Sequence, residues 1–124
     1  MFSHHFYPIN LVMIIGIPDK LLVKWLGKKE YIKPSDEGEA IGIAIGYYLA
    51  TKKRATVFMS ADGFCNALNP LTSDVIPSGI KMNLVISTGR KEPQHIVMTK
   101  ALDKILKAIK YDTKKVNIKI IRKS

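Results

Sequence analysis

The sequence has a single cysteine, Cys65, among 124 residues. One thiol cannot form a disulfide within the chain, and scarce cysteine is typical of a reducing compartment. The first five residues lack the basic start of a secretory signal, and the apolar segment Leu11–Ile17 ends at Pro18 without a cleavage-like site. We therefore expect a cytoplasmic protein.

Hydrophobic runs long enough to span a membrane are also lacking. The uncharged stretch Ala40–Ala50 has eleven residues, whereas a bilayer requires about 20. The chain contains no internal repeat, linker or low-complexity segment. With 47% hydrophobic and 24% charged residues, it has the composition of a single globular domain over residues 1–124, of which 1–10 are expected to be frayed.

Acidic residues are few: ten Asp and Glu stand against twenty Lys and Arg, which gives a net charge of +10. Such a balance indicates nucleic acid or an acidic partner. The basic residues are spread over loops, one helix face and the tail, with no aromatic platform or nucleic-acid-binding motif. A basic nucleic-acid-binding domain is therefore the least favoured reading, and we expect neither nucleic acid nor membrane as a partner.

Short apolar strands alternate with helical segments along the chain. The expected strands are Leu11–Ile15, Glu30–Lys33, Ala55–Met59, Met82–Ser87 and Val116–Ile120, the last half-exposed near a sheet edge. The expected helices are Leu21–Leu26, Ser35–Ala50, Phe64–Asp74 (bent or restarted at Asn69–Pro70) and Ile96–Lys110. This alternation predicts an α/β fold with a mostly parallel sheet and helices on both faces.

The second expected helix has an unusual composition. Ser35 or Asp36 can cap it, and with Asp36 as the cap Glu39 occupies the third helical position of a capping box. Beyond its first turn no face is charged, so we expect burial nearly all round, between the sheet and a second subunit. Two glycines one turn apart, Gly42 and Gly46, would let another backbone approach closely.

Of the three acids at the start of this helix, two have a structural explanation. Asp36 and Glu39 serve the cap and the positive end of the helix dipole, which is worth about 0.3–1 kcal/mol for each. Glu37 adjoins the apolar run without being needed for the cap. If Glu37 is buried, desolvation favours its protonated form, and its carboxyl group is then suited to share a proton with a ligand.

In parallel sheets, ligands bind beyond the carboxyl ends of the strands. Here those ends are the segments Gly16–Lys20, Ser35–Glu37, Ser60–Asn66 and Thr88–His95. They contain nearly every polar residue of the chain that lacks a surface explanation. The sequence therefore predicts a functional site at this edge of the sheet.

Motifs in these four regions carry a family resemblance. In chain order they are Gly16–Leu22, Glu37–Ala40 with Gly46–Tyr47, Asn66–Ser73 and Glu92–His95. Each is weak alone, but their order and spacing resemble those of phosphonopyruvate decarboxylases and sulfopyruvate decarboxylase alpha subunits. More broadly, the chain from Gly16 to its end resembles the pyrimidine-binding domain of thiamine-diphosphate enzymes.

The resemblance implies a chemistry for Glu37. A glutamate at the matching position hydrogen-bonds a ring nitrogen of the cofactor's aminopyrimidine and so activates thiamine diphosphate to decarboxylate a 2-oxo acid, here phosphonopyruvate or sulfopyruvate. The resemblance also implies cofactor contacts from Gly16, Pro18, Gly63 and Asn66.

The resemblance also implies that Asp19, Lys20 and His95 contact the substrate. Lys20 stands where the family tends to carry a small hydroxyl residue; the alternative is an exposed lysine at a helix start. For His95, the alternative to a substrate contact is that the residue only begins the last helix. The turn Asp62–Cys65 replaces a more glycine-rich one in the family.

The sequence lacks the motif with which this family binds the diphosphate. Thiamine-diphosphate enzymes hold the diphosphate through Mg²⁺ on a separate domain, with a Gly-Asp-Gly motif and a later asparagine. The segment Ala61-Asp62-Gly63 lacks the first glycine, and no suitable asparagine follows it. We therefore expect no metal site in this chain. The expected assembly is a hetero-oligomer in which a diphosphate-binding subunit holds Mg²⁺, shares the cofactor and packs on Ala40–Ala50.

The leading interpretation is the pyrimidine-binding subunit of a two-chain 2-oxo acid decarboxylase. The alternative is a non-catalytic relative that keeps the fold as a structural or regulatory partner. This alternative is favoured by the altered turn at Asp62–Cys65 and by the short amino-terminal segment.

Overall fold

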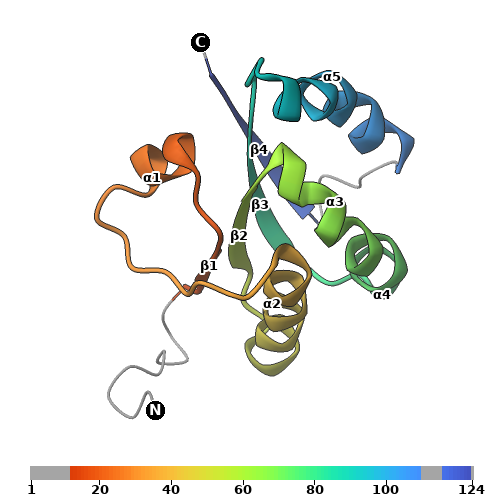
Figure 1. Ribbon diagram of the computed structural model, residues 1–124. Helices are drawn as coiled ribbons and strands as arrows, with labels where there is room; N and C mark the ends of the chain where they lie inside the picture. The colour runs from red at the N-terminus through yellow and green to blue at the C-terminus, as the bar shows by residue number, and fades with distance from the viewer. Residues whose placement is uncertain (1–11, 110–115, 124) are drawn as a thin grey trace.

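Four parallel strands form one sheet in the order β1-β2-β3-β4 in the computed structural model (Figure 1). The structure describes residues 12–109 and 116–123, so the expected frayed segment 1–10 lies outside the described residues. The strands are β1 (Ile14–Gly16), β2 (Ala55–Ser60), β3 (Met82–Thr88) and β4 (Val116–Arg122). The predicted α/β fold with a parallel sheet is confirmed.

Helices cover the two faces of the sheet unequally. The short helix α1 (Lys20–Leu26) packs on one face, where Leu22 and Leu26 contact Phe58 and Val85. The opposite face is covered by α2 (Glu37–Thr51), α3 (Ala61–Pro70), a π-helical turn η1 (Leu71–Val75), α4 (Ile76–Ser78) and α5 (Pro93–Ala108). Figure 1 shows α1 alone on its side of the sheet and the longer helices together on the other.

The sheet pairs its strands in chain order, each parallel to the last. β2 lies between β1 and β3, with Val57 opposite both Ile15 and Leu84. Successive strand residues face opposite sides, so Val57 and Met59 enter the larger core while Phe58 enters the smaller one. All four strands therefore end at the same edge of the sheet.

The first strand differs from its predicted range. β1 begins at Ile14 rather than Leu11, and Val12 is 58% exposed. The strand expected over Glu30–Lys33 is reduced to one isolated bridge, in which Ile32 pairs with Ile15. The reason is that this segment makes only two backbone hydrogen bonds to β1, Ile32 N to Ile14 O and Gly16 N to Ile32 O.

The capping of α2 is confirmed, and the described chain alone buries one side of the helix. Asp36 is the N-cap and accepts a hydrogen bond from Glu39 N at 2.8 Å, while Glu39 accepts one from Ser35 N at 2.7 Å. Only Ala40, Ile41 and Ala44 are buried. The sheet and its neighbouring helix cover one side of α2, and no other described element covers the opposite side.

The third helix starts earlier than predicted. Ser60 caps α3, and its Oγ accepts a hydrogen bond from Gly63 N at 3.1 Å, so Ala61, Asp62 and Gly63 form the first turn instead of a break. Sequence reasoning did not predict this start, because a glycine is normally interpreted as a break in a helix. Pro70 ends α3, and the chain continues as a π-helical turn rather than a bent α-helix.

The last helix also begins early, at Pro93 rather than Ile96. Glu92 is its N-cap, and proline at the first helical position leaves no donor unsatisfied. The predicted edge strand is confirmed: β4 pairs only with β3 among the described strands, and Lys119 is exposed.

Gly16 offers a test of this packing. A Cβ built at Gly16 would lie 2.1 Å from the backbone oxygen of Phe58, which cannot rotate away. We expect Gly16→Ala to lower the free energy of unfolding by about 3 kcal/mol or more, measured by urea denaturation. The control Lys20→Ala, at an exposed position a few residues on, should change it by less than about 0.5 kcal/mol. Equal stability of the two variants would contradict the tight contact between β1 and β2.

Candidate functional site at the carboxyl edge of the sheet

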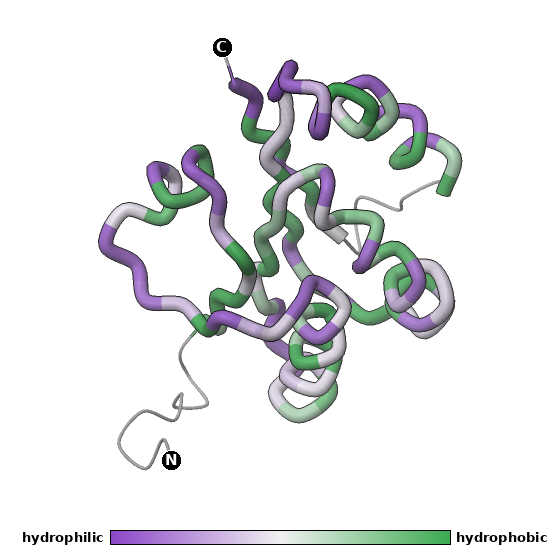
Figure 2. Tube along the Cα trace, viewed as in Figure 1, coloured by the Kyte–Doolittle hydropathy of each residue, from purple (hydrophilic) through white to green (hydrophobic). Residues whose placement is uncertain are grey.

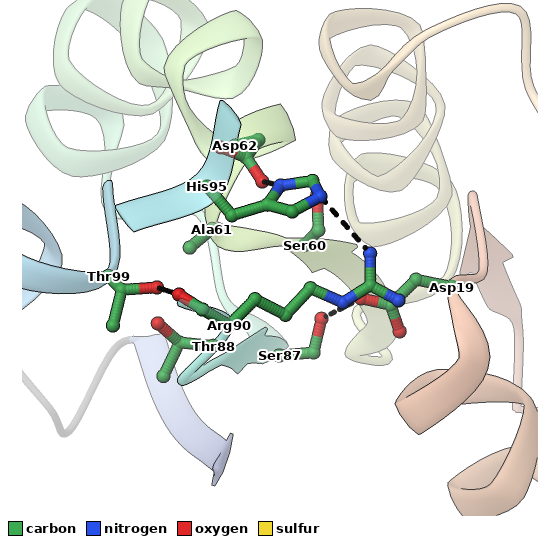
Figure 3. Close-up of a pocket in the computed structure, with 9 residues that line it drawn as sticks. All are labelled: Asp19, Ser60, Ala61, Asp62, Ser87, Thr88, Arg90, His95 and Thr99. Carbon is green, nitrogen blue, oxygen red and sulfur yellow. Dashed lines mark hydrogen bonds and ion pairs between the residues drawn. The ribbon is translucent and has the colours of Figure 1, made fainter. Parts of the chain in front are cut away.

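Polar side chains from five elements or their caps gather where β1, β2 and β3 end (Figure 3). They surround a small pocket of about 10 Å³, roughly the room for one water molecule. Its lining residues are Asp19, Ser60, Ala61, Asp62, Ser87, Thr88, Arg90, His95 and Thr99. Polar side chains at this edge of the sheet therefore line one common small pocket.

Asp19 connects two strand ends in this pocket. As the N-cap of α1, it accepts a hydrogen bond from Leu22 N through Oδ1 at 2.9 Å. Its second oxygen, Oδ2, accepts a hydrogen bond from Ser87 Oγ at 2.6 Å. Because both oxygens are engaged, Asp19 is held in one orientation at the end of β3.

Asp62, His95 and Arg90 form a second chain of contacts. Oδ2 of Asp62 lies 2.6 Å from Nδ1 of His95, and Nη1 of Arg90 lies 3.4 Å from Nε2 of the same ring. Asp62 is the closer partner, so Nδ1 donates its proton to the carboxylate, and Nε2 is the ring nitrogen that faces the guanidinium of Arg90. The two contacts hold the imidazole ring in one orientation in the pocket.

Thr88 contributes an unused hydroxyl to the pocket. Its side chain is only 4% exposed, and Oγ1 has no hydrogen-bond partner within the described chain. Thr99 fixes the adjacent loop by donating a hydrogen bond from Oγ1 to the backbone oxygen of Arg90 at 2.6 Å. A buried hydroxyl without a partner is costly, so a bound molecule or water that pairs with it is favoured here.

The residues expected to contact the cofactor form a neighbouring group. Nδ2 of Asn66 donates a hydrogen bond to Oε1 of Glu37 at 2.9 Å, although 29 residues separate them. A Cβ at Gly63 would lie 2.3 Å from Oε2 of Glu37, so the carboxylate fits only because position 63 is glycine. Glu37 is half-buried at the start of α2.

The other predicted residues have different places. Gly16 is buried in the sheet, where its lack of a side chain serves the contact with β2. Pro18 is half-buried in the turn before α1. Lys20 is exposed and does not line the pocket, which fits an ordinary helix-start lysine, whereas Asp19 and His95 both line it.

Sequence reasoning missed Ser87 and Thr99, and it included Thr88 and Arg90 in a site segment without giving either a role. The available signal was an apolar strand that ends in two hydroxyl residues, followed by a lone arginine after Gly89. Asp62 was considered only as an imperfect match to a diphosphate motif. Its partner His95 is 33 residues away, and spacing alone does not indicate such a pair.

Two further findings concern the described residues. No three side chains among their histidines, cysteines, aspartates and glutamates lie close enough together to hold a metal ion. No described helix combines the length and the apolar character needed to cross a membrane.

The fold and site together define an α/β protein with a polar pocket at the carboxyl edge of an all-parallel sheet. Comparison with known proteins adds no assignment: no protein-family model matches the chain, and neither does any curated protein.

The contact between Asp62 and His95 can be tested directly. We expect Asp62→Ala to remove the acceptor of the Nδ1 proton and lower the free energy of unfolding by about 1 kcal/mol. Nitrogen-15 NMR of the imidazole should show the Nδ1-protonated tautomer in the native chain and in Asp62→Asn, which keeps an acceptor. The alanine variant should give a mixture. An unchanged His95 spectrum in Asp62→Ala would mean that the contact is absent in solution.

Proposed function

We propose that this chain is the pyrimidine-binding subunit of a two-chain, thiamine-diphosphate-dependent 2-oxo acid decarboxylase. The supporting observation is the group formed by Glu37, Gly63 and Asn66. These three residues, which the resemblance assigns to the cofactor, lie together at the carboxyl edge of the sheet, the edge where ligands bind in parallel sheets.

The donor set fits an aminopyrimidine ring. Asn66 holds Oε1 of Glu37, so the carboxylate has a fixed orientation and Oε2 is the oxygen left for a ring nitrogen. Gly63 leaves room for that oxygen, since any side chain there would displace the carboxylate. When bound, thiamine diphosphate would supply the electron sink for decarboxylation, which protein side chains alone lack. The role of Glu37 is to hold a proton at the ring nitrogen.

Side chains near this group would suit an acidic group of the substrate. Arg90 offers a planar guanidinium, which pairs well with carboxylate, phosphonate or sulfonate oxygens. The hydroxyl of Thr88 adds a donor that has no partner within the described chain. Phosphonopyruvate and sulfopyruvate both carry such groups, and the pocket does not distinguish between them.

The diphosphate and Mg²⁺ would be bound by a second subunit, in a hetero-oligomer. That subunit would approach the carboxyl edge, where Glu37 and the pocket open. We assign the working enzyme to the cytoplasm.

One observation favours a non-catalytic alternative. The carboxylate of Glu37 already has a partner inside the chain, Asn66, and this contact joins α2 to α3. A relative that kept the fold as a structural or regulatory subunit would retain such a contact for stability alone.

The decisive test is reconstitution with the candidate diphosphate-binding chain. The complex would be assayed for release of CO₂ from sulfopyruvate and phosphonopyruvate, with thiamine diphosphate and Mg²⁺. We expect Glu37→Gln to assemble normally but to lower kcat by about 10²-fold or more, because glutamine cannot hold the proton. The control Glu30→Gln, at an exposed loop position, should keep full activity. A stable complex with no activity in any form would favour the structural alternative.

A second prediction concerns the isolated chain. Titration calorimetry should detect no Mg²⁺-dependent binding of thiamine diphosphate, because we expect the diphosphate to be held by the other subunit. Tight, Mg²⁺-dependent binding by this chain alone would contradict the division of the enzyme between two chains.

A further inference from the structure

The surface around α1 is basic. Over residues 20–33, the helix and the loop that follows it carry five lysines and a single acid, Glu30, and all six side chains are exposed. The lysines are Lys20, Lys24, Lys28, Lys29 and Lys33. Figure 2 shows the strong purple of hydrophilic residues in α1 and along this loop. We call this surface the α1 face.

The fold does not explain these lysines. No ion pair among the described residues involves any of the five. Lys20 and Lys24 lie one turn apart on the same side of α1, and like charges at that spacing lower the stability of a helix. A surface whose charges repel one another in this way is suited to a strongly negative partner.

Aromatic side chains lie within the same face. The ring of Phe58 in β2 contacts two of them, Trp25 at a centroid distance of 6.0 Å and Tyr31 at 5.3 Å. Nζ of Lys29 lies 4.7 Å from the centroid of the Trp25 ring. Phe58 is fully buried, whereas Trp25 is half-buried and Tyr31 is 37% exposed. The fold therefore assembles an aromatic cluster beside the lysines that no local sequence motif indicated.

The sheet extends this basic surface beyond α1. Lys119 of β4 is exposed and pairs with Val85 of β3, which packs against the leucines of α1. Since paired residues of neighbouring strands share a face, Lys119 lies on the side of the sheet that α1 covers. Ile121, two residues further on, packs against the same cluster. The positive charge of the α1 face therefore continues as far as β4.

Phosphates joined to unstacked bases match this combination of side chains. Lysine ammonium groups pair with phosphates as point charges, and every base has a flat face that stacks on an exposed aromatic ring. Protein interfaces, by contrast, are depleted in lysine. Base edges are distinguished mainly by Arg, Asn and Gln side chains, and residues 20–33 contain none of these. Recognition at this face therefore rests on charge and stacking.

We propose that the α1 face binds single-stranded nucleic acid without sequence preference. The lysines hold the phosphate backbone, and Tyr31 supplies a ring on which a base stacks. A membrane surface fits less well, because α1 has only seven residues and buries Leu22 and Leu26 in its own chain. The inference is independent of the proposed decarboxylase function, and it replaces the expectation that nucleic acid is not a partner.

The first experiment uses Trp25, the single tryptophan of the chain, as a fluorescent probe. The full chain is titrated with a single-stranded oligothymidylate of about 15 nucleotides, and we expect quenching. The logarithm of the binding constant should fall with the logarithm of the salt concentration with a slope of about −3, since each contacted phosphate contributes roughly −0.7. Absence of binding at low salt would overturn the proposal. So would tighter binding to duplex DNA or to anionic phospholipid vesicles.

Paired charge reversals locate the binding surface. At about 0.1 M salt, Lys24→Glu/Lys28→Glu should weaken binding of the oligothymidylate at least about tenfold and make the salt slope shallower by about 1.4, because two phosphate contacts are lost. The matched control is Lys100→Glu/Lys104→Glu, at two exposed lysines of α5 that are also four residues apart.

This control changes the net charge by the same amount on the opposite face of the sheet, where salt screens it beyond a Debye length of about 10 Å. It should therefore bind nearly as tightly as the native chain. Equal weakening by the two double variants would show that overall charge alone attracts the strand, and would overturn the assignment to the α1 face.

Substitutions at Tyr31 test the stacking contact. Tyr31→Ala should weaken binding about tenfold, whereas Tyr31→Phe keeps the ring and should bind as the native chain does. Neither variant should alter the salt slope, because neither removes a charge. Native affinity in the alanine variant, or an equal loss in both variants, would refute a stacking role for this ring.

Discussion

The parallel pairing of β2 with both β1 and β3 is the constraint on which the rest of the structure depends. Their register sets Phe58 opposite Gly16 and Val85, so the three strands end at one edge. Residues far apart in the sequence then meet without any long loop. The pocket exists because backbone hydrogen bonds place the strand ends side by side, and because a glycine at position 16 lets two of the strands approach closely.

Three residues of the candidate site region also cap or begin helices. Asp19 caps α1 while accepting a hydrogen bond from Ser87, and Ser60 caps α3 while lining the pocket. Glu37 begins α2 and accepts a hydrogen bond from Asn66 in the second turn of α3. Helix N-termini carry unpaired backbone donors and partial positive charge, so polar and acidic side chains are stabilising there whatever else they do. Structural and chemical roles cannot be separated at such positions by inspection of one residue.

α2 serves two separate surfaces along its length. Its first turn brings Glu37 to the carboxyl edge, and its outward face presents glycines flanked by Ile43 and Leu49. The buried side of the helix needs only small residues such as Ala40 and Ala44, because the sheet lies directly against them. The absence of charge on the buried side of the helix therefore has a physical cause inside the chain, its direct packing on the sheet.

Local patterns determined the helices, the strands and their caps. The Asp36 cap and the α/β alternation follow from side chains that interact within one turn or one strand. Helix starts marked by Ser60 and Glu92 were misjudged, because glycine or proline in a first turn resembles a break. Only the tertiary structure decided which polar residues meet. The contact of Asp62 with His95 depends on strand order and register, which long-range backbone pairing sets and no local pattern encodes.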